Sequence, residues 1–346
     1  MTRSTTRTTS FDVAALAGVS QSAVSRTFTP GSSIAEETRQ KVLEAAKKLN
    51  YVPNSIASSL TTKRSNIVAL ILGNLGNPFY VHVMHAFSRK LQENGRQVLI
   101  FTVDAGSESD DAILQVLKYQ VDGVILTSAQ LSTRMTSMCH DRGIPIVLFN
   151  RYIPGSDASG VRCDNPAGGR LLAEAFLAAG AKSFLIVTGD PTATTSGDRV
   201  RGFVDRLIEG GIKRADITQI EGNSSYEGAF SATLRYFSSP DAKRPDAIFG
   251  VNDIMAMGVM DALQLRLGLK VPDDLMVAGF DDIPEGRRAP YHLTTVRQPI
   301  NQMVDETLAI LHLDDPTRPI ERGIDRPIAG RLIWRSTIPI PQDAES

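Results

Sequence analysis

Apolar runs alternate with amphipathic segments along most of the chain, from residue 66 to residue 280. The short apolar runs, which predict buried strands, occupy residues 67–72, 97–103, 123–127, 146–149, 184–188, 217–221, 247–251 and 276–280. The segments with apolar residues at helical spacing, which predict helices, include residues 80–94, 110–119, 167–179, 198–209, 226–236 and 254–265. Such strands separated by helices indicate parallel sheets covered on both faces. Because the strands are too many for one regular sheet, we expect two similar doubly wound subdomains.

The N-terminal segment has a different pattern, typical of two short helices around a tight turn. Gly18 can adopt the left-handed conformation that ends the first helix, and Ser20 can cap the second. The apolar side chains expected to face inward are Val13, Leu16, Val19 and Val24. The polar side chains left facing outward are Gln21, Ser22, Ser25 and Arg26. This arrangement is a helix-turn-helix, and it predicts that the protein reads DNA.

A third helix is expected over residues 34–50. Glu36 and Glu37 stand in its first turn and Lys47 and Lys48 in its last, which complements the helix dipole. Its apolar positions 42, 45, 46 and 49 would close a three-helix core over the first pair. The next segment, residues 51–64, is too weakly apolar to form a stable helix alone.

Composition and charge favour a globular DNA-binding protein. The 346 residues are 42% hydrophobic and 22% charged, which indicates two or three globular domains. No apolar run is long enough for a membrane span or a secretory signal, so we expect a cytoplasmic protein. The two cysteines lack metal-ligand spacing. Residues 1–64 hold nine Lys and Arg against four acids, a net charge of +5, and the remainder holds 28 against 34, a net charge of −6. A small basic module on a larger acidic body is expected where one end meets DNA phosphates.

Several short motifs together resemble a known family. They are Asp12-Val13-Ala14, Ala17-Gly18-Val19-Ser20, Val24-Ser25-Arg26, Thr38-Arg39, Val42-Leu43, Leu49-Asn50-Tyr51, Pro53-Asn54, Ala57, Leu60 and Asn77-Pro78-Phe79. Through them the chain resembles the LacI family of bacterial transcription repressors along essentially its whole length. The resemblance implies an all-α helix-turn-helix DNA-binding domain plus an α/β periplasmic-binding-protein-like core of two doubly wound parallel-sheet subdomains.

The resemblance also implies the domain boundaries. The helix-turn-helix domain would occupy residues 1–50, a hinge residues 51–65, and an effector-binding and dimerisation core residues 66–346. Within the core we expect an N-subdomain at about 66–163 and 297–325 and a C-subdomain at about 164–296 and 326–340. In the family the hinge becomes helical on operator DNA, and a leucine matching Leu60 enters the minor groove, where an apolar wedge kinks the duplex.

The expected DNA contacts lie on the second helix and in the hinge. Gln21 and Ser22 are placed to reach base edges, and Arg26 to reach a guanine or a phosphate. The predicted DNA-binding residues are Ser20, Gln21, Ser22, Ser25, Arg26, Arg39, Asn54, Ala57 and Leu60. Operators of this class are inverted repeats, so the implied partners are palindromic operator DNA and a second copy in a homodimer. Dimerisation is expected through helices of the core such as 80–94 and 110–119.

Polar residues after the strands of the core predict an effector site, because ligands of doubly wound sheets bind outside the carboxyl ends of strands. The predicted effector-binding residues are Asn74, Phe79, Tyr80, Asn150, Arg151, Arg199, Asn252 and Asp281. Arg199 matches the arginine that in the family grips effector hydroxyls or a carboxylate, and Asp281 is the favoured acid across the cleft. Such a pair beside an aromatic platform suits a sugar or a sugar acid.

Three neighbouring predictions keep an alternative open. A helix N-cap is the preferred interpretation of Asp282 and an alternative one for Asp253. Arg151 would favour an anionic effector if it faces the cleft, and a surface role is equally compatible.

The residues therefore predict a DNA-binding transcriptional regulator, most simply a repressor, controlled by a small polar effector and needing neither a cofactor nor a metal. An enzyme is the main alternative, but the sequence lacks the common phosphate-binding, metalloprotease and nucleophile motifs. A transport-binding protein would share the core, yet it needs a signal peptide where this chain has its helix-turn-helix. An effector that releases DNA and one that promotes binding are both compatible with the sequence.

Overall fold

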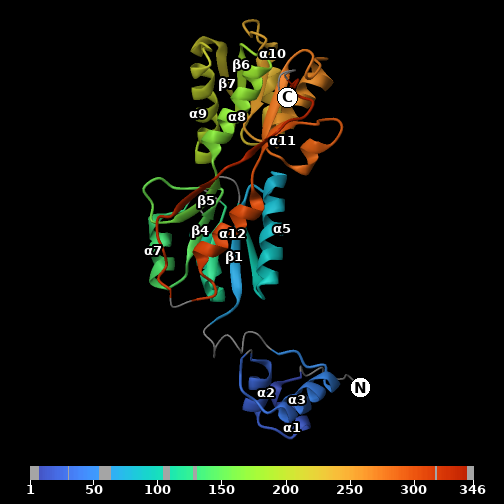
Figure 1. Cartoon of the computed structure of the whole chain (residues 1–346), viewed down its shortest axis with the longest axis vertical. Coiled ribbons are helices and arrows are strands. Elements are labelled where there is room, and N and C mark those ends of the chain that lie inside the picture. Colours follow the sequence, from blue (N-terminus) through green and yellow to red (C-terminus); the bar gives the residue numbers. More distant parts are fainter. Residues whose placement is uncertain are drawn as a thin grey trace. The chain divides into compact units, whose positions relative to one another are not determined.

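The computed structural model describes residues 8–29, 31–53, 64–103, 110–127, 131–315 and 318–340. The chain divides into two compact units, residues 1–65 and residues 66–346 (Figure 1). Among the described residues, the smaller unit contains three helices and the larger unit contains two six-stranded sheets.

The small unit is built from α1 (Ser10–Ala17), α2 (Gln21–Phe28) and α3 (Glu36–Lys48). Thr9 and Asp12 form a capping box at the start of α1, and Gly18 ends the helix with a φ of 66°. Ser20 caps α2 by accepting a hydrogen bond from the backbone N–H of Ala23. The predicted left-handed glycine and the predicted serine cap are therefore both confirmed.

A compact apolar core holds these three helices together. Its buried members are Val13, Ala14, Val24, Val42, Ala45 and Ala46. Val19 and Leu49 are partly buried against it. The prediction that Leu16 faces inward is wrong, because its side chain is 51% exposed. The buried face of this short helix is centred on Val13 and Ala14, and position 16 lies at the edge of that face.

The first sheet of the large unit has the order β11-β5-β4-β3-β1-β2, and all its strand pairs are parallel. Its strands are β1 (Ile67–Gly73), β2 (Gln97–Val103), β3 (Gly123–Leu126), β4 (Ile146–Phe149), β5 (Ser159–Cys163) and β11 (Asp325–Ile328). Its helical elements are α5 (Pro78–Glu93), α6 (Asp110–Val116), η1 (Leu117–Tyr119), α7 (Thr133–Asp141) and α12 (Ile300–Leu311). We call this sheet with its helices the N-subdomain.

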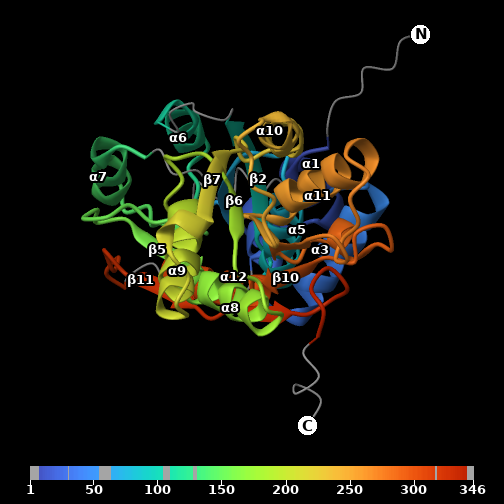
Figure 2. The same ribbon diagram turned by 90° about the horizontal axis from the view of Figure 1, so that it is seen from above.

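The second sheet has the order β12-β10-β9-β8-β6-β7, in which only the β10–β12 pair is antiparallel. Its strands are β6 (Phe184–Thr188), β7 (Ile217–Glu221), β8 (Ala247–Gly250), β9 (Met276–Asp281), β10 (Thr294–Arg297) and β12 (Arg331–Ile333). Its helical elements are α8 (Asn165–Ala178), α9 (Thr194–Glu209), η2 (Arg214–Asp216), α10 (Tyr226–Ser238), α11 (Asp253–Asp261), η3 (Ala262–Arg266) and η4 (Pro284–Arg287). Figure 2 shows α8 and α9 on one side of β6 and α10 and α11 on the other. We call this sheet with its helices the C-subdomain.

The chain passes between the two subdomains three times: from β5 into α8, from β10 into α12, and from β11 into β12 (Figure 1). The third passage lies between Ile328 and Arg331, because β11 pairs with β5 and so belongs to the first sheet. The expected boundary at residue 326 assigned most of this strand to the C-subdomain, and the sheet pairing corrects it. Three adjacent connections of this kind let two rigid subdomains change their mutual angle without breaking either sheet.

The architecture confirms the predicted fold class of a helix-turn-helix domain with two parallel-sheet subdomains. Strands β5, β10, β11 and β12 and helices α7 and α12 were not among the predicted elements. Strand β11 shows why: it reads Asp-Arg-Pro-Ile, and its first three positions are exposed. Proline and charged residues are tolerated at the edge of a sheet, where they conceal a strand from a search for apolar runs.

Candidate functional site

The outer face of α2 carries four of the predicted DNA-binding side chains. The residues Gln21, Ser22, Ser25 and Arg26 are all exposed there. The Ser20 hydroxyl, used as the helix cap, lies 2.9 Å from the hydroxyl of Ser22. Within the described part of this unit Arg26 forms no ion pair, so its guanidinium is available to a base edge or a phosphate.

Arg39 is partly committed to contacts inside the unit. Its Nη1 donates to the carbonyl oxygen of Thr27 at 3.3 Å, and its Nε lies 3.8 Å from a carboxylate oxygen of Glu36. Arg39 therefore joins α3 to the end of α2, and only its remaining donors could reach a phosphate. The other predicted DNA-binding residues, Asn54, Ala57 and Leu60, lie outside the described residues.

A pocket lies between the two subdomains, and all eight predicted effector-binding residues line it. The N-subdomain contributes Asn74, Phe79, Tyr80, Asn150 and Arg151, and the C-subdomain contributes Arg199, Asn252 and Asp281. The cavity has a volume of about 40 Å³. Small-molecule sites usually enclose roughly 300–1,000 Å³, so a ligand the size of a sugar requires the two walls to move apart.

The wall formed by the C-subdomain is centred on an ion pair between Arg199 and Asp281, which are both buried. Nη2 of Arg199 lies 3.3 Å from Oδ1 of Asp281. The same guanidinium donates from Nε to Asn165 Oδ1 and from Nη1 to the carbonyl oxygen of Val251, each at 2.8 Å. It also lies 3.9 Å from the centre of the Phe280 ring, in cation–π geometry. The charge and most of the donors of Arg199 are therefore already satisfied.

Close packing of two helices holds Arg199 in place. Arg199 lies on α9, and the backbone of α9 approaches α8 so closely at Gly169 that a Cβ there would collide with the carbonyl oxygen of Arg199. A glycine is needed at position 169 for this approach, because any larger residue would push the two helices apart.

Asp281 connects the two walls of the pocket. Its Oδ1 accepts a hydrogen bond from Gln298 at 2.7 Å, and its Oδ2 accepts one from Asn77 of the N-subdomain at 3.4 Å. Burial raises the pKa of Asp281 above its ordinary value, although the positive charge of Arg199 opposes the shift. Its backbone has a φ of 130°, a conformation that is uncommon for a residue with a side chain and recurs at functional sites.

A second buried acid, Asp253, interacts electrostatically with Asp281. It accepts hydrogen bonds from the backbone N–H of Ile283 at 2.8 Å and from the hydroxyl of Thr295 at 2.5 Å. Burial, and then the negative charge of Asp281, raise the pKa of Asp253 to about 7. The N-cap of α11 is the preceding residue Asn252, whose side chain accepts from the N–H of Met255. Asp253 is therefore not a helix cap. Its side chain joins the start of α11 to the segment after β9 and to β10 by hydrogen bonds.

The wall formed by the N-subdomain contains polar atoms that have no partner. Asn74 and Asn150 follow β1 and β4 with φ values of 53° and 55°, a left-handed conformation that asparagine tolerates. Within the described part of the chain, Asn150 Oδ1 is buried without a hydrogen-bond partner, and so are Nε and Nη1 of Arg151. Buried polar atoms are nearly always hydrogen-bonded, so an unsatisfied group beside a pocket indicates a missing ligand or water.

Two aromatic side chains complete the N-subdomain wall. Phe79 and Tyr80 lie in the first turn of α5, with their rings edge to face and their centres 5.3 Å apart. The side chain of Asn77 caps this helix by accepting the N–H of Phe79 at 3.0 Å, which fixes the direction in which both rings project.

Six residues line the pocket in addition to the eight predicted ones. They are Asn77, which belongs to one of the family motifs, and Ala193, Thr195, Ser196, Ser224 and Val251, which the sequence did not single out. Ser224 follows β7, and Ser196 stands at the start of the helix that follows β6, so the rule that ligands bind at strand ends could have found both. The hydroxyl of Ser224 accepts a hydrogen bond from the backbone N–H of Asp190, and that of Ser196 accepts one from the backbone N–H of Gly189. These hydrogen bonds hold the loop after β6 in place.

Asp282 is not the helix N-cap that was expected. Its side chain is buried and forms ion pairs with three arginines, Arg335 at 2.5 Å, Arg297 at 2.5 Å and Arg287 at 3.0 Å. Burial favours the neutral acid, but hydrogen bonds from Arg335 and Arg297 outweigh it and hold the pKa of Asp282 below its ordinary value. Arg297 ends β10 and Arg335 follows β12, so this cluster holds the two strands beside the passages between subdomains.

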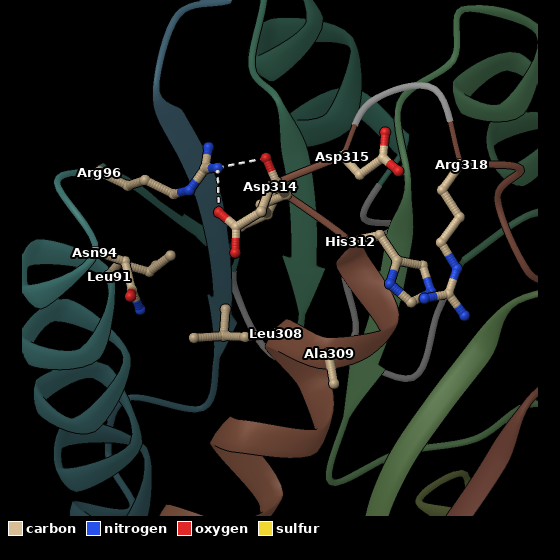
Figure 3. A pocket seen from close by; sticks show the side chains of 10 residues that line it. Leu91, Asn94, Arg96, Leu308, Ala309, His312, Asp314, Asp315 and Arg318 are labelled. Carbon is tan, nitrogen blue, oxygen red and sulfur yellow. Dashed lines mark hydrogen bonds and ion pairs between the residues drawn. The ribbon is translucent and has the colours of Figure 1, made fainter. Parts of the chain in front are cut away.

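A second cavity, of about 280 Å³, lies inside the N-subdomain between the C-terminal ends of α5 and α12 (Figure 3). Its arginines are paired, unlike Arg151. Arg96 donates to the carbonyl oxygen of Leu313 and lies 3.2 Å from Asp314, and Arg318 lies 2.8 Å from Glu321. The arginines of this cavity therefore have a structural role: Arg96 holds the segment that follows α12 by binding the carbonyl oxygen of Leu313 and the carboxylate of Asp314.

The described residues offer little for metal or thiol chemistry. None of them form a group of three or more His, Cys, Asp or Glu side chains that could hold a metal ion. Cys139 and Cys163 are buried, and burial raises the thiol pKa to about 11 and about 12, respectively. Both thiols are therefore protonated at neutral pH. No described helix is long and apolar enough to cross a membrane.

Two family patterns match the chain. Residues 11–54 match the family described as bacterial regulatory proteins, lacI family, and residues 68–289 match the periplasmic binding protein domain. The HTH-type transcriptional regulator DegA of Bacillus subtilis (strain 168) is 33% identical over 301 residues, which cover 86% of this chain and 88% of that protein. The ribose operon repressor of Halalkalibacterium halodurans is 33% identical over 294 residues, covering 85% and 86% of the two chains.

Solved structures share the same architecture. The Lac repressor dimer bound to operator and the anti-inducer ONPF superimposes with a TM-score of 0.84 at 24% identity, covering 96% of this chain and 99% of that chain. The complex of the transcriptional regulator CelR with cellobiose has a TM-score of 0.69 at 27% identity, covering 96% and 100% of the two chains.

Proposed function

The chain belongs to the lacI family of bacterial regulatory proteins and is a DNA-binding transcriptional regulator, and we propose that it is a homodimeric repressor whose operator affinity is set by a sugar or a sugar acid. The observation that carries the effector part is the pocket between the subdomains, which gathers all eight predicted residues from six separate elements or strand ends of both subdomains into one lining. The relatives are transcriptional regulators, and we propose that this chain likewise has no catalytic activity.

The proposed DNA reader is the exposed face of α2. Gln21 can pair with adenine in the major groove, and Arg26 can reach a guanine or a phosphate. The hinge at residues 51–65, with Leu60 as its minor-groove wedge, would supply the second contact. One such module presents little surface, so a palindromic operator and a two-fold dimer are proposed together.

The proposed dimer interface lies on the N-subdomain. Large apolar side chains are exposed on α5, β2, α6 and η1: Val81, Ile100, Leu114 and Tyr119. Exposed apolar side chains on neighbouring elements support an interface between protein chains.

The proposed switch is a change in the angle between subdomains. A ligand that touches Asn150 on one wall and Arg199 on the other binds best at one separation of the walls. By linkage it shifts the population toward that separation. In a dimer, a change in this angle alters the spacing of the two hinge segments, and the hinge sequence is only marginally helical, so a small change decides whether it orders on DNA.

The DNA part is tested by gel-shift titration of a palindromic fragment from the protein's own locus. Arg26→Ala and Leu60→Ala are each expected to weaken specific binding about tenfold or more. Arg206→Ala, which removes a surface pair with Glu174 in the C-subdomain, is the control and should bind as the wild type does. Specific binding that is unaffected by both test variants would exclude the proposed reader.

The effector part is tested by a thermal-shift screen of sugars, sugar acids and polyols. A compound that stabilises the protein should also change the affinity for the operator fragment, because both effects report the same conformational equilibrium. A compound that binds without changing operator affinity would not be an effector.

A further inference from the structure

The two arginines of the pocket differ in whether their charge is compensated. Arg199 faces the carboxylate of Asp281 at 3.3 Å and is further held by Asn165 and Val251. The pair is neutral overall, so this wall is suited to hydroxyl groups, which can both donate and accept. The positive charge of Arg199 is not available to an anionic group of a ligand unless its ion pair with Asp281 is broken.

Among the described residues, Arg151 has no such partner. Its Nε and Nη1 atoms are buried, and they make no hydrogen bond within the described part of the chain. Asp281 is the one acidic side chain among the described residues that line the pocket, and it is taken by Arg199. Arginine carries a positive charge, and no acidic side chain among the described residues that line the pocket pairs with Arg151.

The position of Arg151 is set by the fold. It follows Asn150, whose φ of 55° turns the chain at the end of β4. On the neighbouring strand β5, a Cβ at Gly160 would lie 2.9 Å from the carbonyl oxygen of Arg151, so only glycine lets the backbone sit this close. The backbone of Arg151 is thus fixed at the strand end where ligands of such sheets bind, and its side chain lines the pocket.

An unsatisfied acceptor accompanies this charge. Asn150 Oδ1 belongs to a residue of the same pocket and is buried without a partner within the described residues, and Asn150 as a whole is 3% exposed. The amide oxygen of Asn150 can accept a hydrogen bond from a ligand hydroxyl, and the guanidinium of Arg151 can donate to a ligand carboxylate. A ligand that fits both carries a hydroxyl near a carboxylate. That pair of groups occurs in sugar acids and is absent from neutral sugars.

We propose that the effector is a polyhydroxy carboxylate, a sugar acid, whose carboxylate binds Arg151 while its hydroxyls bind Asn150 and the Arg199–Asp281 pair. This inference rests on the proposed function, because it specifies the ligand of the proposed effector site. A neutral sugar would leave two buried nitrogens of the guanidinium without a hydrogen-bond partner, which weakens its binding relative to the acid of the same stereochemistry.

The test compares matched ligands by isothermal titration calorimetry on the full-length protein. The probes are the hexoses, the hexuronates and aldonates of the same stereochemistry, and the corresponding hexose phosphates. At least one acid is expected to bind about 30-fold or more tightly than its neutral sugar. In Arg151→Met this preference should disappear, because affinity for the acid falls while affinity for the neutral sugar does not. Arg170→Met, in which a surface pair with Glu209 is lost, is the control and should keep the preference.

Each contrary outcome has its own meaning. A neutral sugar that binds as tightly as its acid, an acid bound equally well by Arg151→Met, or a preference for a hexose phosphate would overturn the sugar-acid inference and leave the proposed effector site standing. If no compound of the panel changes operator affinity while specific DNA binding is intact, the proposed class of effector itself fails.

Discussion

The two walls of the pocket contain similar polar residues, but only one of them is satisfied internally. The C-subdomain wall joins Arg199, Asp281 and Asn165 in one hydrogen-bonded cluster. The N-subdomain wall leaves Asn150 Oδ1 and two nitrogens of Arg151 without partners within the described residues. A satisfied cluster is rigid and is present before any ligand arrives, whereas an unsatisfied wall gains most when a ligand arrives. We therefore expect the C-subdomain wall to be formed before the effector binds and the N-subdomain wall to gain more contacts when it binds.

Removing an arginine from the satisfied wall should have the largest effect on stability. Arg199→Ala leaves the carboxylate of Asp281 buried without its ion-pair partner, and the free energy of unfolding should fall by about 3–5 kcal/mol. Urea denaturation measures this change. Arg170→Ala, which breaks an exposed pair with Glu209, should cost less than about 1 kcal/mol. Equal losses in the two variants would show that the Arg199 cluster is not a buried, satisfied network.

The next effect concerns pH and tests the buried acids behind the same wall. Asp253 has an ordinary pKa of 3.8 and a folded-state pKa of about 7. Between these values the unfolded chain has released the proton and the folded one retains it, so this residue lowers stability progressively as the pH rises from about 4 to about 7. Asp253→Asn should remove that decline in urea unfolding measured across this range. An unchanged slope in the variant would contradict a raised pKa.

The opposite sign is expected at Asp282, whose three arginine partners keep its pKa low. Its contribution to stability is present at neutral pH and is lost as the pH falls through the folded-state pKa, because both states are then protonated. The difference in unfolding free energy between the wild type and Asp282→Asn should therefore shrink as the solution is acidified. A difference that is constant with pH would indicate that the charge of Asp282 contributes nothing.

On the unsatisfied wall the corresponding change should be small and favourable. Arg151→Met removes a guanidinium that has unpartnered nitrogens, so the ligand-free protein should be as stable as the wild type or more stable by roughly 1 kcal/mol. Thermal and urea unfolding without ligand measure the effect. A loss comparable with that of Arg199→Ala would mean that the two walls do not differ as described.

The smallest effect is expected for the contact that joins the walls. Asn77→Ser retains a residue able to cap α5 but loses the amide that donates to Asp281 at 3.4 Å. Because this hydrogen bond is long, the unfolding free energy should change by less than about 1 kcal/mol. A larger loss would show that the contact holds the subdomains together.

The sequence predicted the elements that are strongly apolar and the residues that stand at their ends. Strands such as β4 and β6 were predicted to the residue because parallel strands buried on both faces read as continuous apolar runs. Because these strands were placed correctly, the polar residues at their ends could be named as the lining of the pocket. Strand β11 was not predicted, because its Asp-Arg-Pro segment is exposed and lacks an apolar run. It also misplaced Leu16, since helical spacing alone does not say where the buried face of a short helix ends.

What the sequence determined by itself was the class of protein and the list of polar groups at the strand ends, because local patterns of apolar, glycine and capping residues encode secondary structure and its order. The pairing of those groups was decided by the tertiary structure. Arg199 and Asp281 are 82 positions apart and become an ion pair, and Asp282 gathers arginines from three separate segments. Two nitrogens of Arg151 remain without a hydrogen-bond partner among the described residues. Whether a charge is compensated depends on distances across the fold and on burial, and neither quantity is a property of any single segment of the chain.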